Sequence, residues 1–419
     1  MNTTEQLQSA VIIGTGHAGV QAAETLRESG WTGRIVLLGE EQHAPYQRPP
    51  LSKDYLDLDK AAGPLPLRAP SFFEEHRIEL RLGVRVESID RAARSVRLSD
   101  REQVPFSKLV IATGASNRAL DIPGSALSGI VGLKSLDDAG NLRELLGPAR
   151  NIVVVGAGFI GLEFASAARA MGKNVTVLEF ADRPMSRALS PAMGDFFARH
   201  HVDAGINLRL SEGIASFLGN EDGNVATAVS TSGCRYAADL VVVGVGVVPN
   251  TGLARAAGLP VDNGIVVDHG LRTEDPDIYA VGDCASFPSP TGTGRFRLES
   301  VQNSTDQAKH AAGQIAGGAD ARYEPVPWFW SIQGGVRLQI AGLSSPGNET
   351  VLRGDPGSGK FSVFCFDGKV LTAVESVNRP GDHVAARKLL GLGLAVTPEQ
   401  CGDTAFDLKS HSNALVLTG

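Results

Sequence analysis

Residues Ser9 to Ala23 read SAVIIGTGHAGVQAA, and residues Asn151 to Ala165 read NIVVVGAGFIGLEFA. In both stretches a short run rich in β-branched residues leads directly into the pattern GxGxxG, and the residues that follow suit a helix with one apolar face. The first glycine permits a tight turn, the second lets the backbone approach a pyrophosphate, and the third lets the helix pack on the strand. The sequence therefore predicts a strand, turn and helix for dinucleotide binding twice in one chain.

An acidic residue follows the second strand that we expect in each copy. RIVLLGEE (Arg34 to Glu41) follows the first copy, and NVTVLE (Asn174 to Glu179) follows the second. Glu40 and Glu179 are placed to accept hydrogen bonds from the ribose hydroxyls of a bound dinucleotide. We interpret the two copies as two dinucleotide sites, and the alternative is a pair of duplicated sheets that bind nothing.

Three further segments fit the same pattern. KLVIATGAS (Lys108 to Ser116) and DLVVVGVGVVPN (Asp239 to Asn250) each predict a strand that ends in a glycine turn and closes one nucleotide domain. TEDPDIYAVGDCA (Thr273 to Ala285) predicts a strand that delivers Asp283 to a turn beside the first nucleotide site. An exposed acid there would hold a sugar-like chain, and the alternative is an Asx-turn that caps the next helix.

The composition excludes several classes of protein. With 419 residues the chain is too long for one ordinary domain, and we expect two or three. Its 39 basic and 46 acidic residues give a net charge of -7, which lacks the positive excess that nucleic-acid binding needs. No run approaches the roughly 18 apolar residues of a membrane span, so we expect a cytoplasmic protein. The cysteines at 234, 284, 365 and 401 form no CxxC pair, which argues against a disulfide framework and a structural metal site.

The chain as a whole resembles the NADH-dependent, FAD-containing ferredoxin reductases of bacterial oxygenase systems, which are the putidaredoxin-reductase-like enzymes. Two segments carry most of the likeness, because the nucleotide motifs occur in a wider set of flavoprotein disulfide reductases. They are PYQRPPLSK (Pro45 to Lys53) and PWFWS (Pro327 to Ser331). The supporting segments are VIIGTGHAGVQAA, IATGA, VVVGAGFIGLE, YAVGDCA and ESVQNSTDQA.

The resemblance implies an α/β fold with two Rossmann-like dinucleotide-binding domains in the glutathione-reductase arrangement, plus a smaller α+β C-terminal domain. Residues 1–117 and 250–324 would form the FAD-binding domain, residues 118–249 the NAD-binding domain, and residues 325–419 the C-terminal domain. In the last domain, VRLQIAG, ETVLRGD, KFSVFCF and KVLTAVES alternate as antiparallel strands do, and HVAARKLLGLGL follows as a helix.

Carried over residue by residue, the resemblance also implies the binding residues. The FAD site would comprise Gly14, Gly16, Gly19, Glu40, Ala112, Thr113, Gly114, Gly282 and Asp283. The NAD site would comprise Gly156, Gly158, Gly161, Glu179 and Arg183. Arg183 could swing toward a 2′-phosphate, or it could instead stack on the adenine or face solvent. The flavin ring would have Arg48, Lys53, Val301 and Trp330 around it, with core packing as the alternative for Trp330.

Two side chains are expected to act together in catalysis. Lys53 and Glu163 should meet beside the isoalloxazine, where a cation stabilises reduced flavin and a partnered carboxylate keeps that cation in place. The alternative is a solvated lysine and a glutamate on a helix surface. The chain also departs from the family after PWFWS, because Ile332, Gly334 and Gly335 replace an acid and a bulky aromatic, so the hydrogen bond that such an acid makes near the flavin is not carried over.

The function implied is electron transfer from NADH through FAD to a two-iron two-sulfur ferredoxin with an acidic surface, which serves an oxygenase such as a haem monooxygenase. Lys309, Arg387, Lys388 and Lys409 are candidate ferredoxin contacts. The alternatives are a reductase of rubredoxin, quinone or oxygen, and a non-catalytic NADH-sensing protein like apoptosis-inducing factor. Thiol chemistry is disfavoured, because His43 stands where related enzymes carry a redox cysteine and no cysteine precedes Cys234.

Overall fold

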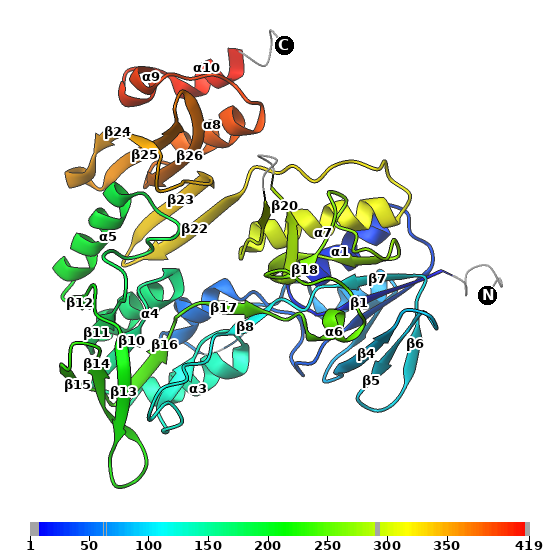
Figure 1. The fold of residues 1–419 in the computed structure, drawn as a ribbon, viewed down its shortest axis with the longest axis horizontal. Coiled ribbons are helices and arrows are strands. Elements are labelled where there is room, and N and C mark those ends of the chain that lie inside the picture. The colour runs from blue at the N-terminus through cyan, green and yellow to red at the C-terminus, as the bar shows by residue number, and fades with distance from the viewer. Residues whose placement is uncertain (1–7, 62, 64, 290–293, 415–419) are drawn as a thin grey trace. The chain divides into compact units, whose positions relative to one another are not determined.

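The computed structural model describes residues 8–61, 63, 65–289 and 294–414. Its contacts divide the chain into two compact units (Figure 1). The first unit holds residues 1–47, 64–116 and 247–325, and the second holds residues 48–63, 117–246 and 326–419. The three-domain boundaries therefore stay a prediction. Residues 48–63, which we expected in the FAD-binding domain, pack with the second unit, because Arg143 donates to the carbonyl groups of Tyr55 and Asp57 at 2.7 Å each.

The first unit is built on a parallel sheet in the order β19-β7-β1-β2-β3. Its strands are β1 (Ser9–Ile13), β2 (Arg34–Leu38), β3 (Ile78–Arg81), β7 (Lys108–Ile111) and β19 (Ile278–Ala280). All five residues of β1 are buried, as are the last four of β2, which is typical of parallel strands covered on both faces. Helix α7 (Val301–Ile315) packs beside α1 (His17–Glu28) at this sheet (Figure 1).

The remaining elements of the first unit are short. They are the helices α2 (Pro70–Glu75) and α6 (Gly252–Ala256), the antiparallel strands β4 (Val86–Asp90), β5 (Ser95–Leu98) and β6 (Gln103–Pro105), the strands β18 (Ile265–Val266), β20 (Ala285–Pro288) and β21 (Arg295–Phe296), and the pair β8 (Ala115–Asn117) and β17 (Val247–Pro249).

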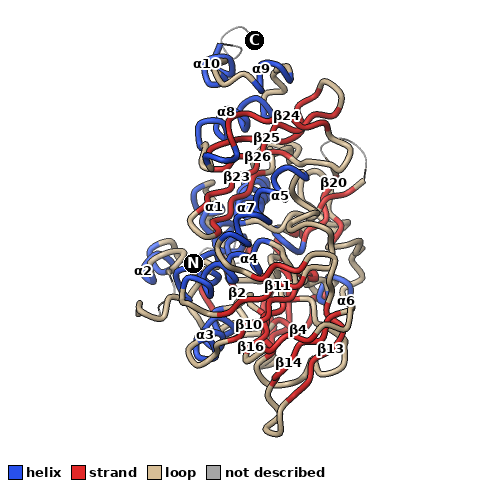
Figure 2. Tube along the Cα trace, turned by 90° about the vertical axis from the view of Figure 1, so that its left-hand side faces the viewer, coloured by secondary structure: helices blue, strands red, loops and turns tan. Residues whose placement is uncertain are grey.

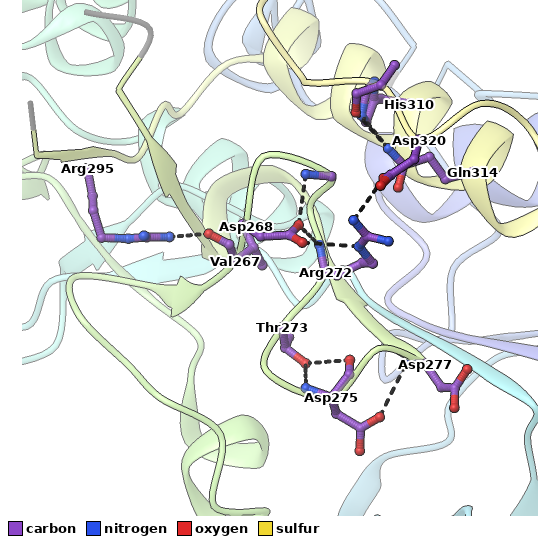
Figure 3. Close-up of polar contacts among 12 residues, drawn as sticks. Val267, Asp268, Arg272, Thr273, Asp275, Asp277, Arg295, His310, Gln314 and Asp320 are labelled. Carbon is purple, nitrogen blue, oxygen red and sulfur yellow. Dashed lines mark hydrogen bonds and ion pairs between the residues drawn. The ribbon is translucent and has the colours of Figure 1, made fainter. Parts of the chain in front are cut away.

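Polar contacts fix the turn that leads into β19 (Figure 3). Asp268 Oδ1 accepts the backbone N–H groups of Gly270 and Arg272 at 2.8 and 2.9 Å. The Arg272 guanidinium forms ion pairs with Asp268 at 3.1 Å and with Asp320 at 2.8 Å. Because β19 runs directly into the turn that carries Asp283, these contacts help to place that acid.

The second unit repeats the same sheet with the order β12-β11-β10-β16-β9, again all parallel. Its strands are β9 (Ile130–Gly132), β10 (Asn151–Val155), β11 (Asn174–Leu178), β12 (Asn207–Arg209) and β16 (Leu240–Val243). Its helices are α3 (Leu136–Leu146), α4 (Phe159–Ala170) and α5 (Pro191–Asp203), and an antiparallel sheet is formed by β13 (Ile214–Gly219), β14 (Val225–Ser230) and β15 (Arg235–Ala237). The predicted pair of Rossmann-like sheets is therefore confirmed.

The C-terminal part is an antiparallel sheet in the order β22-β23-β26-β25-β24, with α8 packed on β23 and β26 (Figure 2). Its elements are β22 (Trp328–Gln333), β23 (Val336–Gly342), β24 (Glu349–Asp355), β25 (Lys360–Asp367), β26 (Val370–Val377), α8 (Pro380–Gly391), α9 (Pro398–Gly402) and α10 (Leu408–Ala414). The predicted strands and helix of this part are confirmed. None of the helices in the described ranges has both the length and the apolar character that a membrane crossing needs.

Candidate dinucleotide and flavin site

The first glycine loop has two closed positions and one open position. Gly14 has a φ of +115°, and a Cβ there would lie 2.2 Å from the carbonyl oxygen of Ala112. A Cβ at Gly19 would lie 1.8 Å from the carbonyl oxygen of Gly14, because the helix sits directly on the turn. A Cβ at Gly16 would meet no atom within 4 Å. The backbone at Gly16 is therefore the point that a phosphate can approach.

The second loop repeats this geometry. Gly156 has a φ of +101°, and a Cβ there would lie 2.5 Å from the carbonyl oxygen of Gly244. A Cβ at Gly161 would lie 2.3 Å from the Gly156 carbonyl oxygen, whereas one at Gly158 would meet nothing closer than 4.0 Å. Both loops therefore fit a pyrophosphate, as FAD and NADH require.

The helix starts after these loops support the same interpretation. Gly16 and Gly158 are the N-cap residues of α1 and α4, and neither helix has a side-chain cap. By contrast, the serines at the N-caps of α3, α5 and α7 each accept a hydrogen bond from the first turn. A bound phosphate would take the place of such a cap at α1 and α4, because the N–H groups of a first helical turn favour an anion.

The acids that follow the second strands are not equivalent. The sheet registers pair Ile13 with Leu38 and Val155 with Leu178, so the residue after the strand is Gly39 in one copy and Glu179 in the other. Glu40 lies one residue further along, with its side chain 71% exposed and 3.7 Å from Arg85. Its part in binding the FAD ribose stays a prediction.

Hydrogen bonds hold Glu179 against the second glycine loop. Its carboxylate accepts the backbone N–H groups of Ala157 at 2.6 Å and of Ala181 at 2.8 Å. Arg183, the other candidate on this strand end, forms an ion pair with Asp182 at 3.5 Å and donates to the carbonyl oxygen of Ser186 at 3.3 Å. The position of Glu179 suits ribose hydroxyls, while local groups already engage Arg183.

Thr113, Gly114 and Asp283 join the first loop. Asn250 holds the Thr113–Gly114 turn, because its side chain donates to the Thr113 carbonyl at 2.9 Å and its backbone N–H donates to the Gly114 carbonyl at 2.9 Å. Gly282 has a φ of +78°, and a Cβ there would lie 3.1 Å from Ser304 Oγ and 3.3 Å from the Ala18 side chain on α1. Asp283 therefore lies close to the start of α1, on the same unit as the glycine loop.

Lys53 and Glu163 form a buried ion pair in the second unit. Lys53 Nζ lies 2.5 Å from Glu163 Oε2, and the Glu163 side chain is only 3% exposed. Ser52 Oγ donates to the same carboxylate oxygen at 2.6 Å, and Ser331 Oγ donates to Oε1 at 2.6 Å. The two residues meet as expected, although their place beside a flavin ring stays a prediction.

A chain of hydrogen bonds extends from Glu163 to a buried histidine. Gln333 Nε2 donates to Ser331 Oγ at 3.1 Å, and Gln333 Oε1 lies 2.8 Å from His201 Nε2. Ser331, Gln333 and His201 are all fully buried. Burial lowers the pKa of His201 from 6.5 to about 4, against the smaller raising effect of its hydrogen bond with Gln333. His201 is therefore neutral at pH 7 and donates from Nε2 to Gln333 Oε1. Every donor in this series of hydrogen bonds points toward Glu163.

The other face of β22 carries both of its tryptophans. Trp328 and Trp330 lie with ring centroids 5.7 Å apart, and the Arg387 guanidinium lies 4.5 Å from the centroid of Trp328. Ile332, which stands where the resemblance implies an acid, is 43% exposed. Trp330 is neither fully buried nor fully exposed, so its expected place beside the flavin stays a prediction.

Gly334 and Gly335 form the two-residue turn between β22 and β23. Both have positive φ values, +52° and +82°, which a type I′ hairpin turn needs. A Cβ at Gly334 would lie 2.8 Å from His200 Nε2. A side chain at position 334 would therefore require the His200 ring to move.

The remaining predicted residues are placed by backbone contacts. Arg48 donates to the Lys134 carbonyl at 2.9 Å, and Val301 is the first residue of α7. Sequence reasoning missed Ser52, Gln333 and His201, together with the contact of Ser331. The even spacing of Ser331 and Gln333 indicates that they share one face of a strand, but it indicates none of their contacts.

The four cysteines are free. Burial raises the pKa of the thiols of Cys284, Cys365 and Cys401, whereas Cys234 is exposed. A thiol with a raised pKa is a poor nucleophile at neutral pH, because the thiolate is the reactive form.

Comparison with known proteins agrees with this geometry. Residues 8–308 match the family model described as pyridine nucleotide-disulphide oxidoreductase, and residues 328–412 match the one described as reductase C-terminal. The chain therefore belongs to the pyridine nucleotide-disulphide oxidoreductases, and it is an oxidoreductase that binds FAD and uses NADH. Within that family it belongs to the ferredoxin reductases of bacterial oxygenase systems.

The relatives behind that assignment match almost end to end. Rhodocoxin reductase from Rhodococcus erythropolis is 50% identical over 401 residues, covering 96% of this chain and 93% of its own. The ferredoxin reductase for the CYP199A2 system from Rhodopseudomonas palustris is 44% identical with a TM-score of 0.94, covering 97% of this chain and 100% of its own. Putidaredoxin reductase in its covalent complex with putidaredoxin is 37% identical with a TM-score of 0.93, covering 98% and 99%.

Proposed function

We propose that this enzyme takes a hydride from NADH bound at Gly156–Gly161 and Glu179, and delivers electrons from FAD to a two-iron two-sulfur ferredoxin that serves an oxygenase. FAD, when bound, accepts two electrons together and releases them one at a time, which is the chemistry that a one-electron acceptor needs. The observation that carries the proposal is the repeated loop with an open middle glycine, at Gly16 and again at Gly158.

The protein's own part is to position the reactants and to set the charge around them. Gly14–Gly19 and the start of α1 would hold the FAD pyrophosphate, and Asp283 would accept hydrogen bonds from its sugar chain. Glu179 would accept hydrogen bonds from the ribose hydroxyls of NADH. Lys53 would present its ammonium group to the flavin, while Glu163 and its two serine donors keep that ammonium group in one place.

The acceptor is inferred from the relatives and from the cysteines. Putidaredoxin reductase has been trapped in a covalent complex with putidaredoxin, and this chain matches it over 98% of its length. A reductase that works through a disulfide needs a reactive thiol, and three of the four thiols here are buried with raised pKa values. We place the enzyme in the cytoplasm, because free cysteines persist in reducing compartments.

Anaerobic stopped-flow mixing tests this function. NADH should bleach the absorbance of protein-bound FAD, and a second mix with a two-iron two-sulfur ferredoxin should restore it as the ferredoxin is reduced. Bleaching without reoxidation by any ferredoxin, but with rapid reoxidation by quinone or oxygen, would point to the other acceptors. The appearance of two new reactive thiols on NADH reduction would overturn the electron-transfer proposal.

A further inference from the structure

Among the residues that the structure describes, Phe180 is the one Phe, Tyr or Trp residue that is exposed. Its side chain is 82% exposed, whereas every other described Phe, Tyr and Trp residue is buried or partly buried. An aromatic ring that stays in water does not contribute the favourable free energy that its burial would give. Binding of a ligand or a partner would bury this side chain.

The backbone on both sides of Phe180 is fixed. Glu179 N–H donates to the Arg209 carbonyl at 2.9 Å, and Glu212 N–H donates back to the Glu179 carbonyl at 2.8 Å. Ser211 N–H donates to the Ala181 carbonyl at 2.8 Å. A Cβ at position 213 would lie 3.2 Å from Cδ2 of the Phe180 ring, so Gly213 leaves room for the edge of the ring. The exposed ring is therefore held at a defined place rather than on a loose loop.

Phe180 directly follows the acid that would bind ribose. Glu179 would accept hydrogen bonds from the 2′ and 3′ hydroxyls of the adenosine ribose. Adenine is bonded to C1′ of the same ribose, so the base must lie within about one ring length of that carboxylate. A flat apolar side chain suits the face of a purine. In the first copy the equivalent position is Glu40, which cannot stack in this way.

We propose that Phe180 is the platform on which the adenine of NADH stacks. This inference rests on the proposed NADH site at Glu179, and it assigns to the second nucleotide loop a residue that distinguishes it from the first. The contact would act on the part of NADH that takes no part in hydride transfer. It would therefore contribute to binding of the coenzyme and not to the chemical step.

Phe180→Ala tests the proposal when NADH is compared with reduced nicotinamide mononucleotide, which lacks the adenosine half. Stacking of a base on an aromatic side chain is worth about 1–3 kcal/mol, which corresponds to roughly 5- to 150-fold. The ratio of kcat/KM for NADH to that for the mononucleotide should therefore fall at least about fivefold, with the loss in KM. Phe180→Trp should keep the wild-type ratio, and so should Val202→Ala, which trims an exposed apolar residue elsewhere in the same unit.

A binding measurement separates this inference from the proposed function. Calorimetric titration of the oxidised holoenzyme with ADP-ribose should show affinity weakened by a similar factor in Phe180→Ala, independently of any ferredoxin. An unchanged NADH to mononucleotide ratio, or an unchanged ADP-ribose affinity, would overturn the inference while the function stands. A higher KM for ferredoxin with an unchanged ratio would overturn it too, and would assign Phe180 to a protein contact. Wild-type enzyme that binds no ADP-ribose and oxidises no NADH would instead sink the proposed function.

Discussion

Ser331→Ala should weaken the hydrogen-bond chain that ends on Glu163. The Ser331 hydroxyl is fully buried, donates to Glu163 Oε1 at 2.6 Å and accepts from Gln333 Nε2 at 3.1 Å. A hydrogen bond to a charged group contributes about 1.5–3 kcal/mol, and a buried acceptor left unpaired costs about as much. Because Ser52 and Lys53 still contact Oε2, we expect the free energy of unfolding to fall by about 2 kcal/mol.

Ser362→Ala is a matched control for that loss. Ser362 is also fully buried, and its hydroxyl donates to a carboxylate, Asp382 Oδ2, at 2.9 Å. The contact joins β25 to α8, and neither Ser362 nor Asp382 is proposed to bind FAD or NADH. Both variants should therefore lose comparable stability in chemical denaturation, and only the change at 331 should reach Lys53.

The functional assay is flavin reduction by NADH under anaerobic stopped-flow conditions, together with the two-electron potential of the bound flavin. Ser331→Ala should reduce the flavin about 3- to 10-fold more slowly, since 1.4 kcal/mol corresponds to a factor of ten and part of the lost energy goes into stability alone. Ser331→Thr keeps a hydroxyl and should recover most of the rate. Equal slowing in the alanine variants at 331 and 362, or wild-type kinetics and potential in both, would refute the positioning role.

Three further results are expected. Lys53→Ala should slow flavin reduction or lower the flavin potential, because the cation that favours reduced flavin is removed; wild-type traces and potential would contradict this. Glu179→Ala should erode an NADH over NADPH preference of about 10- to 1000-fold, since the carboxylate repels a 2′-phosphate, and an initial ratio of kcat/KM near one would show that the strand end is misinterpreted. His201 is neutral when buried, and its pKa falls from 6.5 to about 4 on folding. The part of the free energy of unfolding that depends on neutral His201 is present in full above pH 6.5, and it is lost, by about 3 kcal/mol, as the pH falls toward 4. His201→Gln should therefore flatten the decline of melting temperature over that range. An unchanged slope would count against this role of His201.

The parts that sequence could predict are local in the chain. Each glycine loop places its three glycines within six residues, and the steric reason for each glycine lies within the loop or on the adjoining strand. The parallel strands are apolar runs covered on both faces, which also show in a short window of sequence. The two Rossmann-like sheets were predictable for this reason, and the C-terminal antiparallel strands were predictable from their alternating pattern.

The hydrogen-bond chain to Glu163 was not predictable from pattern. Ser331 and Glu163 are 168 residues apart, and Gln333 and His201 are 132 apart. Serine and glutamine have many uses, so their identity alone indicates no contact. The position of Glu40 was not predictable either. Glu179 directly follows its strand, whereas Glu40 lies one residue further along, and this difference follows from the strand register and not from the spacing to the glycines.

The turn at Gly334 and Gly335 decides which residues of β22 reach Glu163. Both glycines adopt positive φ, so the chain reverses in two residues and pairs Gln333 with Val336. Side chains alternate along a strand, so this register puts Ser331 and Gln333 on the face that meets Glu163 and His201 and leaves Trp328 and Trp330 on the other. A slip of one residue would exchange the two faces and set Trp330 or Ile332 against the carboxylate. The two-glycine turn is therefore compatible with the Lys53–Glu163 pair, because it maintains the register that places Ser331 against the Glu163 carboxylate.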